Sequence, residues 1–110
     1  MIRGASTQFR FKLPYNRANL SDAKIAFWQE GDSGYVTSIT KTLTDCTSDE
    51  HGTRLYVTLN GEETSRFLTD RKGWVQLLGW NTNGVSFSHK KQPFNVYPIS
   101  DVLKEYIDGV

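Results

Sequence analysis

The sequence predicts an all-β protein: an antiparallel, immunoglobulin-like β-sandwich of about seven strands with a short C-terminal helix. Two observations lead to this fold class. Apolar and polar residues alternate with a period of two in most segments, as in strands that bury one face. Turn signals separate these segments at intervals of about 8–12 residues, the spacing typical of a sandwich. With 110 residues, the chain has the length of a single domain.

The stretch 54–80 carries the clearest pattern. Its first segment has apolar residues at alternate positions: Leu55, Val57 and Leu59. Asn60 and the residues after it suit a tight connection that contains one turn of helix, with Phe67 placed to plug that turn into a core. A second strand follows, in which Val75 and Leu77 point inward. Three residues fall on its other face: Trp74, Gln76 and Leu78.

Three strands are predicted before this stretch. Residues 6–13 alternate cleanly and form a half-buried strand. Residues 23–29 form the second strand, with Trp28 pointing outward or lying at an edge. Residues 35–43 are rich in β-branched types and form the third, joined to the second by a hairpin turn at 30–34.

The remaining segments are predicted from their turn chemistry. Residues 44–52 are a polar connection without a helical period, and the Asn-Thr-Asn-Gly sequence at 81–84 is the strongest hairpin signal in the chain. The return strand begins at residue 85, is interrupted over 88–93 and resumes at 94–97. A short helix then begins at Ser100 or Asp101. Its apolar residues have helical spacing: Val102, Leu103, Tyr106 and Ile107.

These patterns define a predicted core, which consists of the inward-facing apolar residues of the strands together with Phe67 from the helical turn. Its members are Phe9, Phe11, Ile25, Phe27, Leu55, Val57, Phe67, Val75, Leu77, Val85 and Phe87.

The charge balance and cysteine content exclude several classes of protein. The formal charge is +1, from 13 basic and 12 acidic residues, which argues against a broad footprint for nucleic acid or an anionic membrane. Six basic residues are scattered: Arg10, Lys12, Arg71, Lys72, Lys90 and Lys91. Cys46 is the single cysteine, so no internal disulfide forms. The sequence has no apolar run of signal-peptide or membrane-span length, so we expect synthesis in the cytoplasm.

No set of residues in the sequence assembles into a catalytic or metal-binding site. Cys46 and His51 lie close together in the chain, but neither metal-ligand spacing nor an orienting third group accompanies them. Glu62 and Glu63 are adjacent, and helix capping accounts for both. We therefore expect a protein that is not an enzyme and that binds no cofactor or metal.

The aromatic residues are the stronger functional signal. Several of them fall on the outward faces of strands: Trp28, Tyr35, Tyr56, Trp74, Trp80 and Tyr97. Three interpretations remain open: cover for the core, a protein interface, or a platform that stacks sugars. The predicted interface also includes residues near both ends of the chain: Met1, Ile2, Tyr106 and Ile107.

The order of several short motifs resembles a group of small tailed-phage proteins of about a hundred residues. The chain opens with MIRG and continues to FKLPYN, and further motifs follow in order: AFWQEG, KTLTDCT, VTLNGEETSRF, VQLLGWNTNG and DVLKEYIDGV. The middle section is also similar in pattern to immunoglobulin-like domains of phage upper baseplate proteins. The resemblance implies a virion structural protein that acts as a head decoration, a connector or a tail or baseplate adaptor.

The resemblance further implies where the protein ends up and what it contacts. Its partners would be other virion proteins in a multi-copy assembly, with no nucleic acid and no membrane, and its location would be the virion. A carbohydrate-binding module that uses exposed Trp and Tyr residues is the alternative function. The apolar ends of the chain predict that the subunit is held through its termini and its sheet edges, either on its own sandwich or on a neighbour.

Overall fold

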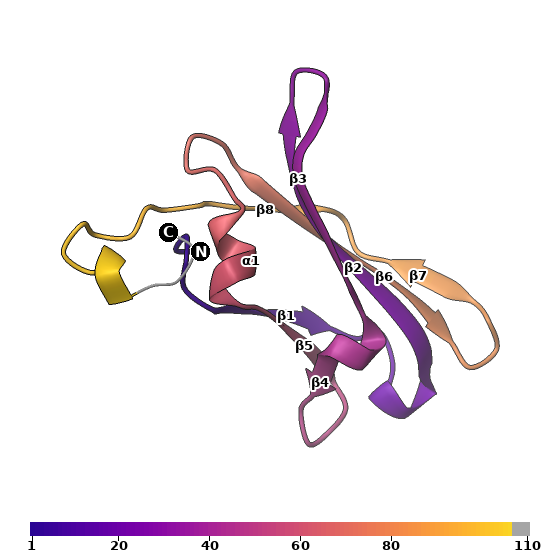
Figure 1. Ribbon diagram of the computed structural model, residues 1–110. Coiled ribbons are helices and arrows are strands. Elements are labelled where there is room, and N and C mark those ends of the chain that lie inside the picture. The colour runs from indigo at the N-terminus through magenta and orange to yellow at the C-terminus, as the bar shows by residue number, and fades with distance from the viewer. Residues whose placement is uncertain (107–110) are drawn as a thin grey trace.

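A computed structural model of the protein describes residues 1–106. Eight strands form two antiparallel sheets, as Figure 1 shows. The strands are β1 (Thr7–Lys12), β2 (Leu20–Gly31), β3 (Gly34–Thr42), β4 (Cys46–Ser48), β5 (Arg54–Leu59), β6 (Gly73–Asn81), β7 (Ser86–Ser88) and β8 (Gln92–Phe94). The helical segments described are α1 (Gly61–Ser65) and three short 3₁₀ turns at Arg17–Asn19, Leu43–Asp45 and Lys104–Tyr106.

The order of the strands confirms the predicted fold class. One sheet has the order β1-β5-β4, and the other has the order β3-β2-β6-β7, with β8 also paired to β6. An immunoglobulin domain places strands B, E and D in one sheet and C′, C, F and G in the other, and the two orders coincide strand for strand. Before β1, Ile2 forms an isolated parallel bridge with Tyr97, which follows β8.

The core lies between the inner faces of the two sheets. On the larger sheet, Phe27 pairs in register with Val75. The ring of Phe9 crosses from the smaller sheet to meet the ring of Phe27 at a centroid distance of 4.9 Å. The buried apolar residues are Leu13, Leu20, Ala23, Ile25, Phe27, Ile39, Leu55, Val57, Leu59, Phe67, Val75, Leu77 and Val96.

The predicted core needs one correction and one qualification. Val85 is 62% exposed, because its backbone closes the β6–β7 turn on Asn81 and its side chain points to solvent. Phe9, Phe11 and Phe87 pack against the core but are only partly buried. Phe9 and Phe11 belong to β1 and Phe87 belongs to β7, and each of these strands has a neighbouring strand on one side only in the described structure.

Two strand assignments also differ from the sequence prediction. The connection predicted at 44–52 contains β4, a three-residue strand that pairs with β5 and is too short to show a period. The interrupted return strand is confirmed as β7 and β8, but it ends at Phe94 rather than continuing to Tyr97. Pro93 lies opposite Trp74 in β8, at the edge position where a missing N–H costs no ladder bond.

The helical turn before β6 forms where the sequence predicts it. Asn60 caps α1: its side-chain oxygen accepts from the Glu63 N–H at 2.8 Å, and the Glu63 carboxylate accepts from the Asn60 N–H at 3.0 Å. The hydroxyl of Thr64, fully buried, accepts from the N–H of Gly4 and donates to the carbonyl of Ala5. This pair of hydrogen bonds fixes the chain ahead of β1 to α1, beside the N-terminus in Figure 1.

The predicted C-terminal helix is reduced to one 3₁₀ turn within the described residues, at Lys104–Tyr106. Its apolar side chains do not pack on the sandwich, since Val102, Leu103 and Tyr106 are all exposed. Ile107 lies outside the described residues.

Candidate functional site

The outer face of the larger sheet gathers four of the predicted interface residues. Trp28 on β2 lies directly opposite Trp74 on β6, and both are half-buried. Tyr35 on β3, which is 71% exposed, and Trp80 at the end of β6 share this face. We call this surface the aromatic face; its other members are Ala26, Ser38, Gln76 and Leu78.

A small network of contacts fixes the two central indoles. The Trp28 ring N–H donates to the Glu30 carboxylate at 3.3 Å. The Lys91 ammonium lies 3.5 Å from the same carboxylate and 4.3 Å from the centroid of the Trp74 ring. Because this cation covers one face of Trp74, the exposed aromatic surface is mainly that of Trp28 and Tyr35.

A shallow hollow of about 300 Å³ lies beside these two side chains. Its lining is Ala26, Trp28, Tyr35, Ser38 and Gln76. The amide nitrogen of Gln76 donates to the His89 carbonyl at 2.9 Å. The hollow therefore offers mainly ring surface, with the Ser38 hydroxyl and the Gln76 amide oxygen as its polar groups, a combination that suits an apolar side chain better than a strongly polar ligand.

The outer face of the smaller sheet has a different character. Tyr56, another predicted interface residue, lies there on β5 with the Arg10 guanidinium 5.8 Å from its ring centroid. Lys12 on β1 lies directly opposite Arg54 on β5. None of these three cations forms an ion pair with a described residue. We call Arg10, Lys12, Arg54 and Tyr56 the basic face. The sequence shows these cations only as scattered, because their proximity depends on the pairing of β1 with β5.

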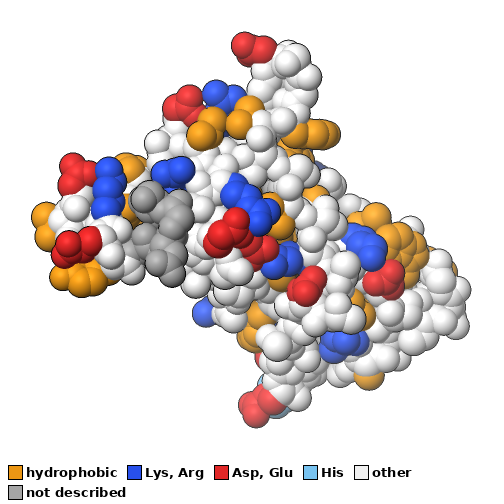
Figure 2. Space-filling model, viewed as in Figure 1, with side chains coloured by type: hydrophobic (Ala, Val, Ile, Leu, Met, Phe, Trp, Pro, Cys, Tyr) orange, Lys and Arg blue, Asp and Glu red, His pale blue; other side chains and the backbone are white. Residues whose placement is uncertain are grey.

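Of the predicted residues near the ends of the chain, Met1, Ile2 and Tyr106 are described, and none of them belongs to either face. The carbonyl of Met1 accepts from the Tyr97 N–H at 2.9 Å, and the Tyr97 carbonyl accepts from the Arg3 N–H. Met1, Ile2 and Tyr97 thus contact one another within one chain. Tyr106 is 75% exposed. Figure 2 shows hydrophobic side chains in separate groups, one of them over the segment drawn yellow at the left of Figure 1.

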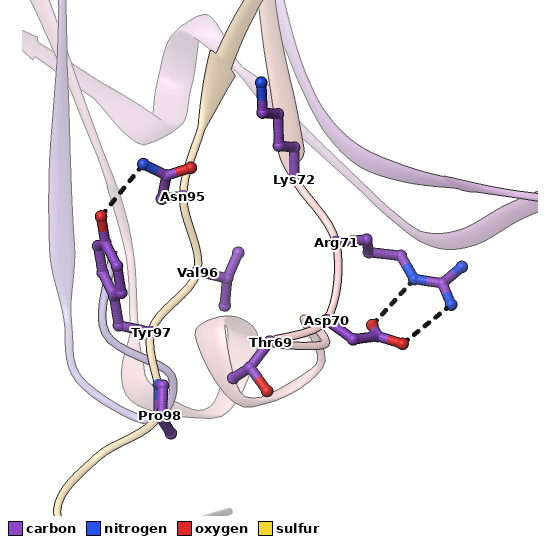
Figure 3. Close-up of a pocket in the computed structure, with 8 residues that line it drawn as sticks. All are labelled: Thr69, Asp70, Arg71, Lys72, Asn95, Val96, Tyr97 and Pro98. Atoms are coloured by element: carbon purple, nitrogen blue, oxygen red, sulfur yellow. Dashed lines mark hydrogen bonds and ion pairs between the residues drawn. The ribbon is translucent and has the colours of Figure 1, made fainter.

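Another hollow, of about 450 Å³, is formed by the connection before β6 and the segment after β8. Figure 3 shows its lining: Thr69, Asp70, Arg71, Lys72, Asn95, Val96, Tyr97 and Pro98. Most of its polar groups bond to one another or to the backbone. Arg71 contacts the Asp70 carboxylate at 3.1 Å and the Glu30 carbonyl, and the Asn95 amide donates to the Tyr97 hydroxyl. These local pairings leave few free groups for a ligand.

The residues weighed for chemistry from the sequence are not brought together as a reactive site. Burial, followed by the neighbouring Asp45 charge, raises the pKa of the Cys46 thiol to about 11, and the thiol donates to the Thr42 carbonyl. A thiol with so high a pKa is a poor nucleophile at neutral pH. His51 is exposed and contacts Glu50 at 3.2 Å.

Within residues 1–106, no group of three or more His, Cys, Asp or Glu residues is placed to hold a metal ion. No helix of that part of the chain has the length and hydropathy to cross a membrane.

Comparison with known proteins adds no relative: no family model matches the sequence, and no curated protein does.

Proposed function

We propose that this protein is a structural subunit of a tailed-phage virion, a small immunoglobulin-like domain that joins other virion proteins as a head decoration, connector or tail or baseplate adaptor. The observation that carries the proposal is the aromatic face. Trp28 and Trp74 are paired across two central strands and remain half-buried. Aromatic residues at the centre of a flat surface are typical anchors of protein interfaces. The resemblance of the ordered motifs supplies the phage context.

The geometry of the aromatic face favours a protein partner over a stacked sugar. Lys91 lies over Trp74, so a sugar ring would have to displace a cation that is also paired with Glu30. A partner side chain needs only the exposed surface of Trp28, Tyr35 and the hollow between them. Glu30 and Lys91 at the margin of that surface supply the polar rim expected of a protein interface.

Particle incorporation tests this proposal. Trp28→Ala should lower the amount of protein in purified particles by about tenfold or more, because a central aromatic anchor contributes about 2 kcal/mol or more to binding. Val85→Ala is the matched control, since Val85 is an exposed apolar residue on a distant turn. Quantitative gel analysis of particles gives the copy number and separates a decoration from a connector or adaptor. Absence of the wild-type protein from purified particles would contradict the proposal.

Carbohydrate binding is the second candidate, and the hollow beside Trp28, Tyr35 and Ser38 is the observation that favours it. Exposed rings next to a hydroxyl are the usual composition of a sugar subsite. Binding of the isolated protein to a glycan array, lost on Trp28→Ala and kept on Trp28→Phe, would favour this function. An array without signal would leave the protein interface as the role of the aromatic face.

A further inference from the structure

Strand β1 has a free edge. In the described structure, β1 pairs with β5 on one side and with no strand on the other. An immunoglobulin sheet places strand A at this position. Here the residues before β1 lie instead beside Tyr97, so that they leave this edge open. An open edge presents backbone groups that can pair with another chain.

The register identifies which backbone groups are free. Leu13 donates its N–H to the Thr53 carbonyl, which makes this a hydrogen-bonded position of the β1–β5 ladder. Hydrogen-bonded and non-hydrogen-bonded positions alternate in an antiparallel pair. Phe9 and Phe11 therefore bond toward β5. The residues whose N–H and C=O groups point to the open side are Gln8, Arg10 and Lys12.

The side chains of β1 determine the chemistry of a strand that would pair there. On the inner side, Phe9 and Phe11 are only partly buried, and the Phe9 ring meets that of Phe94 at 5.3 Å. An added strand with apolar residues on this side would cover both rings. Alternate residues of that strand point to the other side, where they would meet Arg10 and Lys12.

The basic face provides an independent observation. Lys12 and Arg54 lie at a non-hydrogen-bonded position, where side chains of an antiparallel pair come closest. Like charges directly opposite each other destabilise a sheet. The Asp49 carboxylate accepts from the backbone N–H of Arg54, but neither the Lys12 nor the Arg54 side chain forms an ion pair with a described residue, so the arrangement favours an anionic group from outside the chain.

We propose that the open edge of β1 accepts an extended segment of a partner virion protein whose side chains alternate between acidic and apolar. The segment bonds to the backbone of Gln8, Arg10 and Lys12. Its apolar residues pack on Phe9 and Phe11, and its acidic residues pair with the basic face. This inference rests on the proposed virion role, which provides the partner chain, and it specifies the chemistry of that partner.

A peptide experiment tests the pairing on the full chain. The probe is a short, fluorescently labelled peptide that alternates valine and glutamate, and the reference is a peptide of the same composition in scrambled order. The alternating peptide should bind at least about tenfold more tightly, because only it satisfies backbone, apolar and charged groups together. Equal binding of the two peptides would show charge attraction alone and would overturn the inference.

Two pairs of variants locate the binding. Gln8→Pro removes a backbone N–H that points to the open side, without changing the charge, and should weaken peptide binding about tenfold. Gln8→Ala keeps this N–H and should leave peptide binding unchanged. Arg10→Glu combined with Lys12→Glu should abolish it, while Lys24→Glu combined with Lys72→Glu, on other surfaces, should not. The charge-reversal pair decides the question if Gln8→Pro does not fold. Unchanged binding by a folded Gln8→Pro or by the Arg10→Glu, Lys12→Glu variant would overturn the inference.

Particle incorporation separates this inference from the proposed function. The Arg10→Glu, Lys12→Glu variant should be missing from particles that contain the wild-type protein. If the variant is incorporated normally, the β1 edge is not the contact and the virion role stands. If the wild-type protein is itself absent from particles, the virion role fails while peptide binding still tests the edge.

Discussion

The outer faces of the two sheets differ in whether their charged side chains are paired within the chain. On the larger sheet, charged and aromatic side chains are matched within the chain: Glu30 pairs with Lys91, and Lys91 covers Trp74. On the smaller sheet, Lys12 faces Arg54 and neither has an acidic partner among the described residues. The aromatic face leaves Tyr35 and part of Trp28 exposed, but its charged groups at Glu30 and Lys91 are paired. The basic face retains a like-charge pair, which weakens a sheet.

The inner faces differ in the same sense. Phe27 on the larger sheet is fully buried between neighbours on β3 and β6. Phe11 on the smaller sheet is partly buried, because β1 is an edge strand with one neighbour. The edge strand β1 is therefore less completely covered than the central strands of either sheet, since Leu55 and Val57 on β5 are fully buried like Phe27.

The largest expected effect is on the free energy of unfolding. Phe27→Ala should reduce it by about 3–5 kcal/mol, because a large buried ring is replaced by a cavity. Phe11→Ala should cost about half as much, since part of that ring is already in contact with water. Urea denaturation of both variants measures the two losses. Equal losses would show that the inner faces do not differ in the way the burial indicates.

A smaller effect concerns the turn between β4 and β5 in the smaller sheet. Hydrogen bonds from the Thr53 hydroxyl and the Arg54 N–H lower the pKa of Asp49 to about 2, from an ordinary value of 3.8. Because the folded state binds this proton less readily than the unfolded chain, the contribution of Asp49 to stability is complete above about pH 4 and is lost as the pH falls toward 2. Asp49→Asn should therefore flatten the fall in stability over that range.

Thermal unfolding followed between pH 5 and pH 2, roughly the window set by this carboxyl, measures the difference. Thr53→Val, which removes the leading hydrogen bond, should flatten the curve in part. A pH dependence identical in Asp49→Asn and wild type would mean that this turn does not couple proton binding to folding.

The smallest effect is a gain. Lys12→Gln should raise the free energy of unfolding by about 0.2–1 kcal/mol at low salt, because it removes the cation opposite Arg54. The gain should disappear at high salt, where exposed charges are screened. Lys24→Gln on the other sheet, where the residue opposite on β6 is Leu78, is the control and should give no gain. A loss of stability in Lys12→Gln would remove the basis for calling the basic face strained.

The sequence predicts those parts of the fold that depend on local pattern. The alternation from Leu55 to Leu59 and at Val75 and Leu77, the helical turn after Asn60 and the burial of Phe67 each follow from a few neighbouring residues, and all are confirmed. The outward positions of Trp28 and Trp74 follow from the same period. Their pairing with each other does not, because it depends on which strands become neighbours and in which register.

The remaining features depend on contacts between distant segments. Gln29 continues the inward face of β2 and is fully buried, because its amide bonds to the backbone of Leu68 and Arg71. Because glutamine is usually exposed in folded proteins, the sequence does not predict that this residue is buried. Likewise, β4 becomes a strand only through its pairing with β5, and the basic face exists only because β1 pairs beside Arg54.

The contacts of Met1 with the segment after β8 also affect the order in which parts of the domain can form during synthesis. The Met1 nitrogen donates to the carbonyl of Asn95, 94 residues away in the chain. At the pace of ribosomal synthesis, about 5–20 residues per second, the residues ahead of β1 wait on the order of 5–20 s for the segment that holds them. During that interval β1 obtains its single neighbour once β5 has been made. The edge assigned here to a partner strand is thus formed long before the domain closes, so the nascent chain must remain soluble with that edge exposed.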